Sequence, residues 1–275
     1  MQELQKLLKI MADLRDPESG CPWDVAQSFD SIAAYTVEEA YEVADAIERK
    51  DMADLKNELG DLLFQVVFHA QMASENGQFD FADVVNEIND KLIRRHPHVF
   101  GDDKTRDAEK LYSDWEKHKK KERAEKGLSG DDKPVGYLDG IASTMPALRW
   151  SEKLQKRAAH HGFDWDDIQP VFDKLQEEIG ELKAEIDVAQ NDLASNQQKI
   201  ADEMGDILFA SVNLSRHLGV NPEQALRDSN RKFILRFEVV EQLLREDGRQ
   251  MEDCSVAVLE DYWQKAKARI KNTRP

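Results

Sequence analysis

The chain has 275 residues, of which 40% are hydrophobic and 34% are charged, and its 55 acidic against 38 basic side chains leave a formal charge of −17. This length suits one large domain or two of ordinary size, and no stretch approaches the roughly 18 consecutive apolar residues of a membrane helix. The negative charge disfavours nucleic acid and anionic membranes as partners, although local cations or bound metal ions still permit a small anion. We therefore expect no nucleic acid and no membrane among the partners.

The first residues and the cysteines indicate the compartment. The amino-terminal stretch MQELQKLLKIMADLRD is amphipathic and charged, without the apolar core of a signal peptide. The only cysteines, Cys21 and Cys254, lie far apart in the sequence, so no disulfide framework is expected. These features predict a cytoplasmic protein.

The first acidic motif lies in residues 35–47, YTVEEAYEVADAI, and reads Glu-Glu-x-x-Glu. Thr36 and Glu39 have the spacing of a capping box, so we expect a helix that begins at Thr36. Positions three and four apart share one face of a helix. Glu39 and Glu42 therefore point the same way.

The second acidic motif follows on a second predicted helix. Apolar residues recur every three or four positions between 55 and 70, which is the pattern of a helix with one broad buried face. This segment carries Glu58 and Asp61 with Gly60 between them. A glycine inside a helix costs about 1 kcal/mol relative to alanine, and it indicates a place where a neighbouring backbone or a ligand comes close.

A third helix and a linker complete the first half. Residues 88–95, INDKLIRR, place Lys91 and Arg95 four apart on one helix face. The lysine-rich segment 117–126 is interpreted as a solvated helix end rather than a nucleic-acid patch, because the rest of the chain is acidic. Residues 127–140 collect glycine, serine, aspartate and proline, and they predict a linker.

The second half repeats these motifs in the same order. ELGDLLFQVVFHAQ at 58–71 matches EMGDILFASVNLSR at 203–216, and VEEAYEV at 37–43 matches QEEIGEL at 176–182. Weaker matches relate CPWD to GFDW, INDKLIRR to SNRKFILR and YSDWEKHK to EDYWQKAK. Ordered self-similarity of this kind predicts a duplicated unit.

The predicted fold is therefore all-α, with two tandem helical-bundle modules. The periodic helices supply apolar stripes that must be covered, and no alternation typical of strands is found. The predicted domains are an N-terminal module at 1–126, a linker at 127–140 and a C-terminal module at 141–275.

The duplicated acids predict two metal sites. If the two acidic helices of a module pack antiparallel, four carboxylates converge, and two like charges about 4 Å apart repel by roughly 4 kcal/mol at an effective dielectric near 20. Such a cluster needs a counter-ion, and carboxylate oxygens without His or Cys favour Mg²⁺ or Mn²⁺ over Zn²⁺. The alternative is a solvated acidic surface, which the double occurrence and the glycines disfavour. The predicted ligands are Glu178, Glu181, Glu203 and Asp206, with a second set at Glu39, Glu42, Glu58 and Asp61.

Cations lie at helical spacing from the acids of the second module. Lys174 and Lys199 each come four residues before a motif acid, so each can project beside the carboxylates. Lys232 and Arg236 are four apart and can bind one phosphate chain, since an arginine fork suits phosphate. The combination of hard-metal ligands and phosphate-binding cations predicts a reaction at phosphorus.

Two further roles stay open at this level. Trp263 and Trp115 offer faces on which a base can stack, against the alternative that each belongs to a core. Glu177 is a motif acid that the metal does not need, so it could orient or deprotonate an attacking water.

The chain resembles the MazG family of nucleoside triphosphate pyrophosphohydrolases, of the all-α NTP pyrophosphatase superfamily, in its two-module form. The resemblance covers nearly the whole chain and is carried by GCPWD (20–24), the 35–47 segment, the two E-x-G-D blocks and RRHPHVF (94–100). It implies Mg²⁺-dependent hydrolysis of NTPs and dNTPs to monophosphate and pyrophosphate in nucleotide-pool housekeeping, with Mn²⁺ as a substitute ion. It also implies a homodimer and catalysis chiefly in the C-terminal module.

The resemblance also implies roles for individual residues. The metal ligands would be Glu178, Glu181, Glu203 and Asp206, and the nucleotide contacts would come from Lys174, Lys199, Lys232, Arg236, Trp263 and Lys119.

Two rivals to this activity remain. A hydrolase of another phosphorylated nucleotide, such as phosphoribosyl-ATP or dUTP, shares the acid pattern. A helical dimerisation module whose acids only bind divalent ions is the second rival. The residues alone also do not choose the active copy, because the first copy retains its acids together with Lys91, Arg95 and Trp115.

Overall fold

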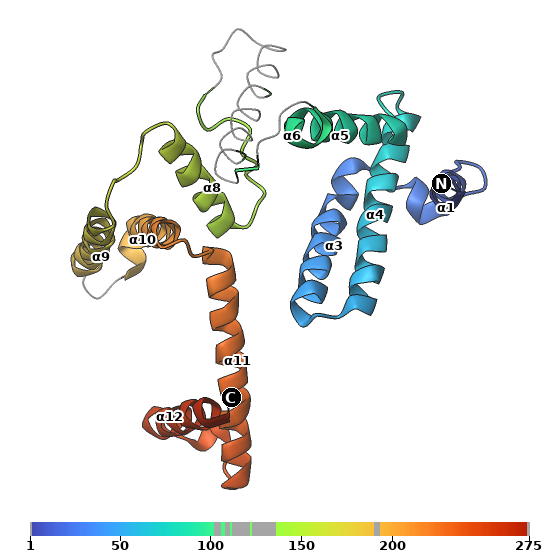
Figure 1. Cartoon of the computed structure of the whole chain (residues 1–275). Coiled ribbons are helices and arrows are strands. Elements are labelled where there is room, and N and C mark those ends of the chain that lie inside the picture. Colours follow the sequence, from blue (N-terminus) through green and yellow to red (C-terminus); the bar gives the residue numbers. More distant parts are fainter. Residues whose placement is uncertain are drawn as a thin grey trace. The chain divides into compact units, whose positions relative to one another are not determined.

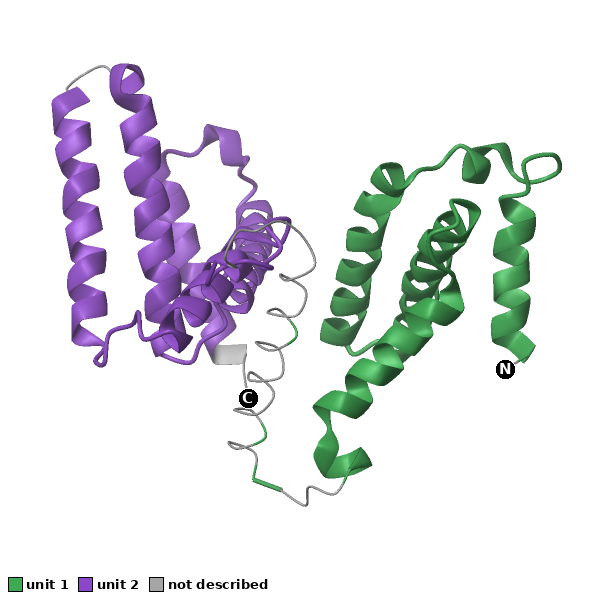
Figure 2. Cartoon of the chain, turned by 90° about the horizontal axis from the view of Figure 1, so that it is seen from above, with its two compact units in different colours: residues 1–122 green, residues 123–275 purple. Residues whose placement is uncertain are grey.

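The structure is a computed structural model that describes residues 2–101, 106, 107, 111, 122, 136–189 and 193–273. All regular elements in these residues are helices, as predicted. The chain divides into two compact units, Met1–Glu122 (unit 1) and Arg123–Pro275 (unit 2), which Figure 2 draws in different colours. The division falls a few residues before the predicted linker at 127–140, most of which lies outside the described residues.

Unit 1 is built around a helical hairpin, in which α3 and α4 pack side by side (Figure 1). The turn between them is tight because Lys50 adopts a left-handed conformation with φ of 57° and Asp51 caps α4 by accepting from the amides of Ala53 and Asp54. The helices of the unit are α1 (Gln2–Leu14), α2 (Pro22–Val25), α3 (Phe29–Arg49), α4 (Met52–Glu75), α5 (Phe81–Arg95) and α6 (Pro97–Phe100).

The core of unit 1 joins α1 to this hairpin. Met11 from α1, Ile32 from α3 and Phe68 from α4 are each 1% exposed or less and pack in one cluster. Val67 and Met72 complete the cluster from α4. Because large apolar side chains fill this space, unit 1 has a closed core between α1 and the acidic helices.

The predicted start of the first acidic helix at Thr36 is wrong. α3 begins at Phe29, and Ser28 caps it by accepting from the Ser31 amide while the Ser31 hydroxyl accepts from the Ser28 amide. Thr36 lies inside the helix, where its hydroxyl donates to the Ile32 carbonyl. Two capping boxes compete in the sequence, and the earlier one is used because it brings Ile32 into the core.

Unit 2 repeats the hairpin with α9 and α10, which pack against each other, while α8 packs on α10 (Figure 1). α11 contacts α8 and α10 and then extends to carry α12 (Figure 1). The described elements are α8 (Ala147–His160), α9 (Gln169–Ala189), η1 (Leu193–Asn196), α10 (Gln197–His217), α11 (Pro222–Glu246), η2 (Met251–Asp253) and α12 (Val256–Thr273).

The carboxyl-terminal half of α11 and α12 form a small core of their own. Val240 and Leu244 of α11 are buried against Tyr262 and Ala266 of α12, and the Tyr262 hydroxyl donates to Asp247. This core is separate from the α9–α10 hairpin, so α11 links two packed regions within unit 2.

Two sequence expectations concern the cysteines and the membrane. Cys21 and Cys254 are both free and lie in different units. Of the helices that the structure describes, none combines the length and apolarity needed to cross a membrane.

Candidate metal and nucleotide site

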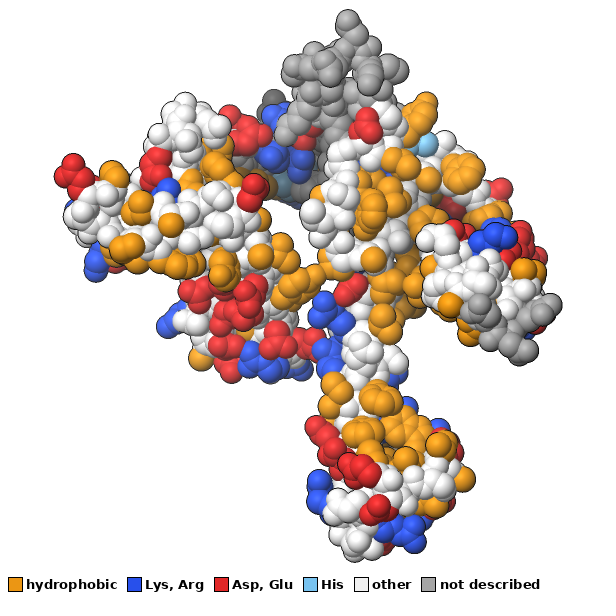
Figure 3. All heavy atoms as spheres, turned by 180° about the vertical axis from the view of Figure 1, so that it is seen from behind, with side chains coloured by type: hydrophobic (Ala, Val, Ile, Leu, Met, Phe, Trp, Pro, Cys, Tyr) orange, Lys and Arg blue, Asp and Glu red, His pale blue; other side chains and the backbone are white. Residues whose placement is uncertain are grey.

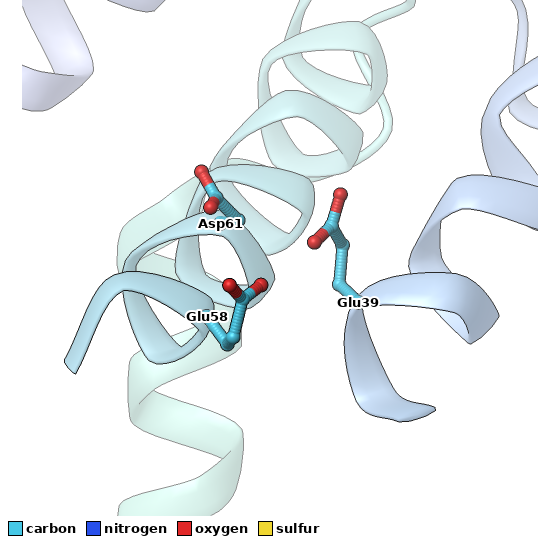
Figure 4. Close-up of side chains that lie close together, drawn as sticks. All are labelled: Glu39, Glu58 and Asp61. Carbon is cyan, nitrogen blue, oxygen red and sulfur yellow. The ribbon is translucent and has the colours of Figure 1, made fainter. Parts of the chain in front are cut away.

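Unit 1 brings three of its four predicted ligands together. Figure 4 shows Glu39 of α3 facing Glu58 and Asp61 of α4 across the hairpin. One carboxylate oxygen from each residue lies within 4.8 Å of the others. The arrangement arises because Glu58 and Asp61 are three apart on one helix face and that face is turned towards α3.

Unit 2 holds the matching group of three acids. Glu178 comes from α9, and Glu203 and Asp206 come from α10, with one oxygen of each again within 4.8 Å of the others. Glu178 is buried, Glu203 is half-buried and Asp206 is exposed. The group is therefore open to solvent on the Asp206 side and anchored on the Glu178 side.

The fourth predicted ligands, Glu42 and Glu181, are exposed and lie outside these groups of three. Each still interacts with its group. A hydrogen bond with Glu58 raises the pKa of the Glu42 carboxyl, and partial loss of water contact followed by a hydrogen bond with Glu178 raises the pKa of the Glu181 carboxyl. Both carboxyls therefore lie one hydrogen bond away from the proposed ligands.

The gathered charges also act on the ligands themselves. Desolvation and then the Asp61 and Glu58 charges raise the pKa of the Glu39 carboxyl. Desolvation and then the charges of Asp206 and Glu178 raise the pKa of Glu203. In both units, negative charge has accumulated where a cation would relieve it.

The donor set fits a hard divalent cation. Carboxylate oxygens alone form the groups, and an oxygen-ligated Mg²⁺ holds its ligands at about 2.0–2.1 Å, so that two ligands on opposite sides are roughly 4 Å apart. Oxygens that already lie within 4.8 Å of one another need only small side-chain adjustments to reach such a shell. Each unit can therefore hold a divalent metal ion.

Lys174 lies beside the acids of unit 2, as its spacing predicts. Its Nζ is 2.8 Å from Glu178 and 2.9 Å from Glu177, and hydrogen bonds to these two carboxylates raise the pKa of the ammonium. Lys199 lies elsewhere, because its Nζ is 3.6 Å from Glu185 on α9 and its side chain is largely exposed. Glu177 is itself exposed and paired to Lys174.

Lys232, Arg236 and Trp263 gather on α11 and α12, apart from the acids. The Arg236 guanidinium lies 5.9 Å from the centre of the Trp263 ring, which also packs 5.2 Å from Phe233. Lys232 follows Pro222, the first residue of α11, by ten positions, which is about 15 Å along a helix. The cavity that Lys232 and Arg236 line shares no residue with the one that Lys174, Glu178 and Asp206 line.

The α11–α12 site is a cationic cavity of about 450 Å³. Sequence reasoning missed Lys267 and Lys271, although their spacing of four on α12 is the signal that identified Lys232 and Arg236. Neither Lys232 nor Arg236 forms an ion pair with another residue that the structure describes. The cavity is lined by Lys232, Leu235, Arg236, Lys267, Ile270 and Lys271.

A larger cavity, of about 670 Å³, adjoins the acids of unit 2. Lys174, Glu178 and Asp206 lie on its wall, and the remaining wall is mainly apolar. Sequence reasoning missed this cavity, including two buried amides, Gln155 and Asn213, that line it. Aligning the two E-x-G-D blocks would have drawn attention to Asn213, because a phenylalanine stands at its place in unit 1.

The side-chain oxygen of Gln155 is buried without a hydrogen-bond partner among the described residues. Its Nε2 donates to the Phe209 carbonyl at 2.8 Å, whereas its Oε1 is buried and accepts no hydrogen bond from the described residues. A buried acceptor without a donor costs about 1–3 kcal/mol.

The two motif glycines and two further residues remain among the predicted features. A Cβ added at Gly60 or Gly205 would meet nothing within 4 Å, so no neighbouring backbone in the described chain explains these glycines. Trp115 and Lys119 lie outside the described residues.

Three acids facing one another across a helical hairpin, beside a cavity and a lysine, are typical of proteins that bind a divalent metal ion and phosphorylated ligands. The MazG nucleotide pyrophosphohydrolase domain matches residues 27–100 and again residues 168–241, and the chain belongs to this family. Each matched segment contains one group of three acids, which confirms both the resemblance and the duplication.

Named relatives extend the match over the whole chain. The chain is 49% identical over 267 residues to the nucleoside triphosphate pyrophosphohydrolase of Escherichia coli K12, covering 97% of this chain and 98% of that protein. It is 43% identical over 263 residues to the nucleoside triphosphate pyrophosphohydrolase/pyrophosphatase MazG of Thermotoga maritima, covering 96% and 95%. The nucleoside triphosphate pyrophosphohydrolase of Mycobacterium tuberculosis is 32% identical over 163 residues, covering 58% of this chain and 47% of that protein.

Proposed function

We propose that the acid group of unit 2 is the principal catalytic site of a nucleoside triphosphate pyrophosphohydrolase. The chain hydrolyses NTPs and dNTPs to nucleoside monophosphate and pyrophosphate. The observation that carries the assignment is the grouping of Glu178, Glu203 and Asp206 within 4.8 Å, with Lys174 beside them. The family and the names of the relatives support the same reaction.

The charges around the two acid groups favour unit 2. By the repeat alignment, Lys174 corresponds to Tyr35 in unit 1, so unit 1 lacks the lysine that lies beside the acids of unit 2. Lys199 corresponds to Asp54, which is bound to Arg49, but Lys199 itself lies at Glu185 and not at the acid group. A site for a polyanion needs positive charge near its metal ligands, and at the Lys174 position only unit 2 supplies it.

The Lys/Arg pairs of the two units also differ in the positive charge that they leave available. In unit 1, Arg95 binds Glu122, and Lys91 lies 3.5 Å from Glu87. Their unit 2 counterparts form no ion pair with the described residues. Their charge is therefore available to a phosphate chain, which supports Lys232 and Arg236 as substrate contacts together with Trp263.

The metal is proposed to be Mg²⁺, with Mn²⁺ as a substitute. Held by Glu178, Glu203 and Asp206 with Glu181 near by, the ion would neutralise phosphate charge and acidify a bound water. Glu177 lies next to this group and is exposed, so it can accept a proton from a water that approaches the α-phosphate. Lys174 holds Glu177 and Glu178 in place and faces the phosphates. Lys119 is proposed as a further nucleotide contact.

We also propose that the chain acts as a homodimer in the cytoplasm. Large apolar side chains are exposed on α11, including Phe233 at 56%, Ile234 at 54% and Leu235 at 50%, and apolar side chains gather on this part of the surface in Figure 3. A second copy would cover them and could bring the cationic cavity of one chain to the acids of the other. Two free cysteines support a reducing compartment.

The dimer has a direct test. Light scattering after size-exclusion chromatography should give twice the chain mass for the wild type and a monomer for Ile234→Glu, since the added charge opposes burial of α11. A monomeric wild type contradicts the dimer.

Product analysis tests the reaction. The purified chain is incubated with Mg²⁺ and a panel of NTPs, dNTPs, dUTP and phosphoribosyl-ATP, and the products are separated. Monophosphate with pyrophosphate from several NTPs is the expected result. Orthophosphate with diphosphate contradicts the proposed bond, activity on phosphoribosyl-ATP or dUTP alone supports the rival hydrolases, and no turnover supports a binding module.

A further inference from the structure

The 670 Å³ cavity of unit 2 has no role in the metal chemistry described so far, although it begins at the metal ligands. Its size falls within the roughly 300–1,000 Å³ of small-molecule sites, which are mostly apolar with a few placed polar groups. Glu178 and Asp206 form one edge, and Phe163, Trp165 and Val171 contribute to the apolar wall.

Unit 1 shows that the same fold can close this space. The repeats align Phe68 with Asn213 and Ile32 with Val171. Phe68 and Ile32 are each 1% exposed and fill the core of unit 1 beside Met11. Unit 2 has a smaller aliphatic residue and a polar amide at these two positions, and the cavity lies there. Two positions that line the cavity in unit 2 are thus filled by larger apolar side chains in unit 1.

Gln155 gives the cavity a hydrogen-bond acceptor. The residue is 7% exposed, lines the cavity and holds its amide against the Phe209 carbonyl, which leaves Oε1 without a donor from the described residues. Phe209 follows the metal ligand Asp206 by three positions, about one turn of α10. An unsatisfied acceptor therefore lies about one helical turn from the proposed reaction centre.

A hydrogen-bonded ion pair lines another part of the cavity. Arg216 of α10 binds Asp164 through both terminal nitrogens, and its Nε donates to Asn213 Oδ1 at 3.0 Å. Asp164 lies between Phe163 and Trp165 in the segment before α9, so the ion pair holds the backbone that carries these two lining residues. Flat apolar walls suit the faces of a base.

We infer that this cavity receives the nucleoside part of the substrate, with an N–H group of the base donating to Gln155 Oε1 while the α-phosphate lies at Glu178, Glu203 and Asp206. The inference rests on the proposed function and adds to it the site of base recognition. An acceptor selects bases that present an amino or ring N–H group on that edge. The base then lies in the 670 Å³ cavity, and the Trp263 ring, which packs on Phe233 and lies beside Arg236, is left as a contact for another part of the nucleotide.

The test compares Gln155→Leu and Asn213→Phe with the wild-type chain. Gln155→Leu removes the acceptor, and KM for the preferred NTP should rise about tenfold, the size of one hydrogen bond of about 1.4 kcal/mol. Asn213→Phe introduces the side chain that closes the core of unit 1, and it should raise KM by more than about tenfold by filling the cavity. In both variants the inhibition constant of tripolyphosphate, which has phosphates and no base, should stay unchanged.

Gln65→Leu is the matched control. Gln65 is a buried glutamine of α4 in unit 1 whose Oε1 also accepts no hydrogen bond from the described residues. Its replacement should leave KM and base preference unaltered. If tripolyphosphate inhibition weakens together with NTP binding in Gln155→Leu, the residue acts on the whole site and the inference is overturned.

The outcomes separate this inference from the proposed function. Wild-type turnover with unchanged KM in both cavity variants overturns the inference and leaves the reaction intact. If the wild type turns over no NTP, the proposed reaction fails, and calorimetric binding of nucleoside monophosphates then decides the inference by itself. Binding that Asn213→Phe abolishes supports the cavity as a nucleoside site, and no binding to the wild type overturns it.

Discussion

The two units of this chain each bring three corresponding acids together within different surroundings. Glu39, Glu58 and Asp61 in unit 1 match their unit 2 counterparts in helix and spacing, and in both groups one oxygen of each acid lies within 4.8 Å of the others. Unit 1 also has Tyr35, an arginine (Arg95) that is ion-paired to Glu122, and a core filled by large apolar side chains. At the corresponding positions unit 2 has Lys174, an arginine (Arg236) without an ion pair to any residue that the structure describes, and a cavity.

The difference teaches that a metal-binding motif and a substrate site are separable. A few residues at helical spacing are enough to place carboxylates on one face of a helix. Any copy of the hairpin that keeps this spacing therefore brings its acids together. The residues proposed here for phosphate and base recognition also lie on other helices, namely α8, α11 and α12. Those residues can change in one copy without disturbing the ligands.

The largest contrast is expected when one acid of each group loses its charge. Glu203→Gln should reduce kcat/KM on the order of 10³-fold, since it removes charge from the centre that stabilises the reacting phosphate. The equivalent Glu58→Gln should keep most of the activity. Pyrophosphate release is measured for both, with circular dichroism to check that the helices persist. Equal losses would mean that both units catalyse.

Core packing gives the next largest contrast. Phe68→Ala should cost unit 1 about 3–5 kcal/mol because it leaves a large void in a closed core. Asn213→Ala should cost unit 2 only about 1–3 kcal/mol, because it removes an acceptor of Arg216 beside space that is already open. Urea unfolding of the full chain measures both. Similar losses would show that unit 2 is packed as tightly as unit 1 at this position.

The aligned arginines, Arg95 of α5 and Arg236 of α11, are expected to differ in substrate binding. Arg236→Gln should raise KM for NTP by roughly 10- to 150-fold, the worth of a charged hydrogen bond of about 1.5–3 kcal/mol. Arg95→Gln should leave KM unchanged, because Arg95 binds Glu122. Steady-state kinetics on the two variants decide this point, and a raised KM in Arg95→Gln would assign phosphate contacts to unit 1 as well.

The smallest expected effect is a pH dependence in unit 1. Hydrogen bonds from Arg95 and, more weakly, Arg94 lower the pKa of Glu122 from its ordinary 4.5 to about 2. A depressed carboxyl pKa stabilises the folded chain above the ordinary value, and this stability is lost as the pH falls from about 4.5 towards 2. The difference in melting temperature between wild type and Arg95→Gln should therefore shrink between pH 6 and pH 3, by an amount kept small by partial solvent contact.

Arg236→Gln is the control for this measurement. Arg236 forms no ion pair with the described residues, so its effect on the melting temperature should not vary over the same pH range. A parallel pH dependence in both variants would contradict the assignment to Glu122.

Much of the fold and of the acid groups was accessible from the sequence. Helical periodicity identified the hairpins, and the spacing of Glu58 with Asp61 and of Glu203 with Asp206 placed each pair on one face. The error at Thr36 arose because the sequence contains two capping-box spacings close together, Ser28 with Ser31 and Thr36 with Glu39, and local spacing does not say which one begins the helix. Tertiary packing decided the helix start.

The cavity residues could not be predicted in the same way. Gln155 belongs to no motif, and its importance comes from a carbonyl on another helix that holds its amide. Lys199 has the same spacing to an acid as Lys174, yet it turns towards Glu185 because α9 passes on that side. Such choices depend on how helices pack, which periodicity along one helix does not contain.

Lys174 has one more consequence for unit 2. The Lys174 ammonium lies 2.8 Å from Glu178, so the chain itself already supplies one positive charge to the acid group. On the proposed function, a divalent ion held by Glu178 would compete with Lys174 for this carboxylate, and the ammonium would then be free to contact a phosphate. Metal binding and substrate binding would thereby be coupled through one side chain. Unit 1, with Tyr35 at the aligned position, offers no lysine for such an exchange there.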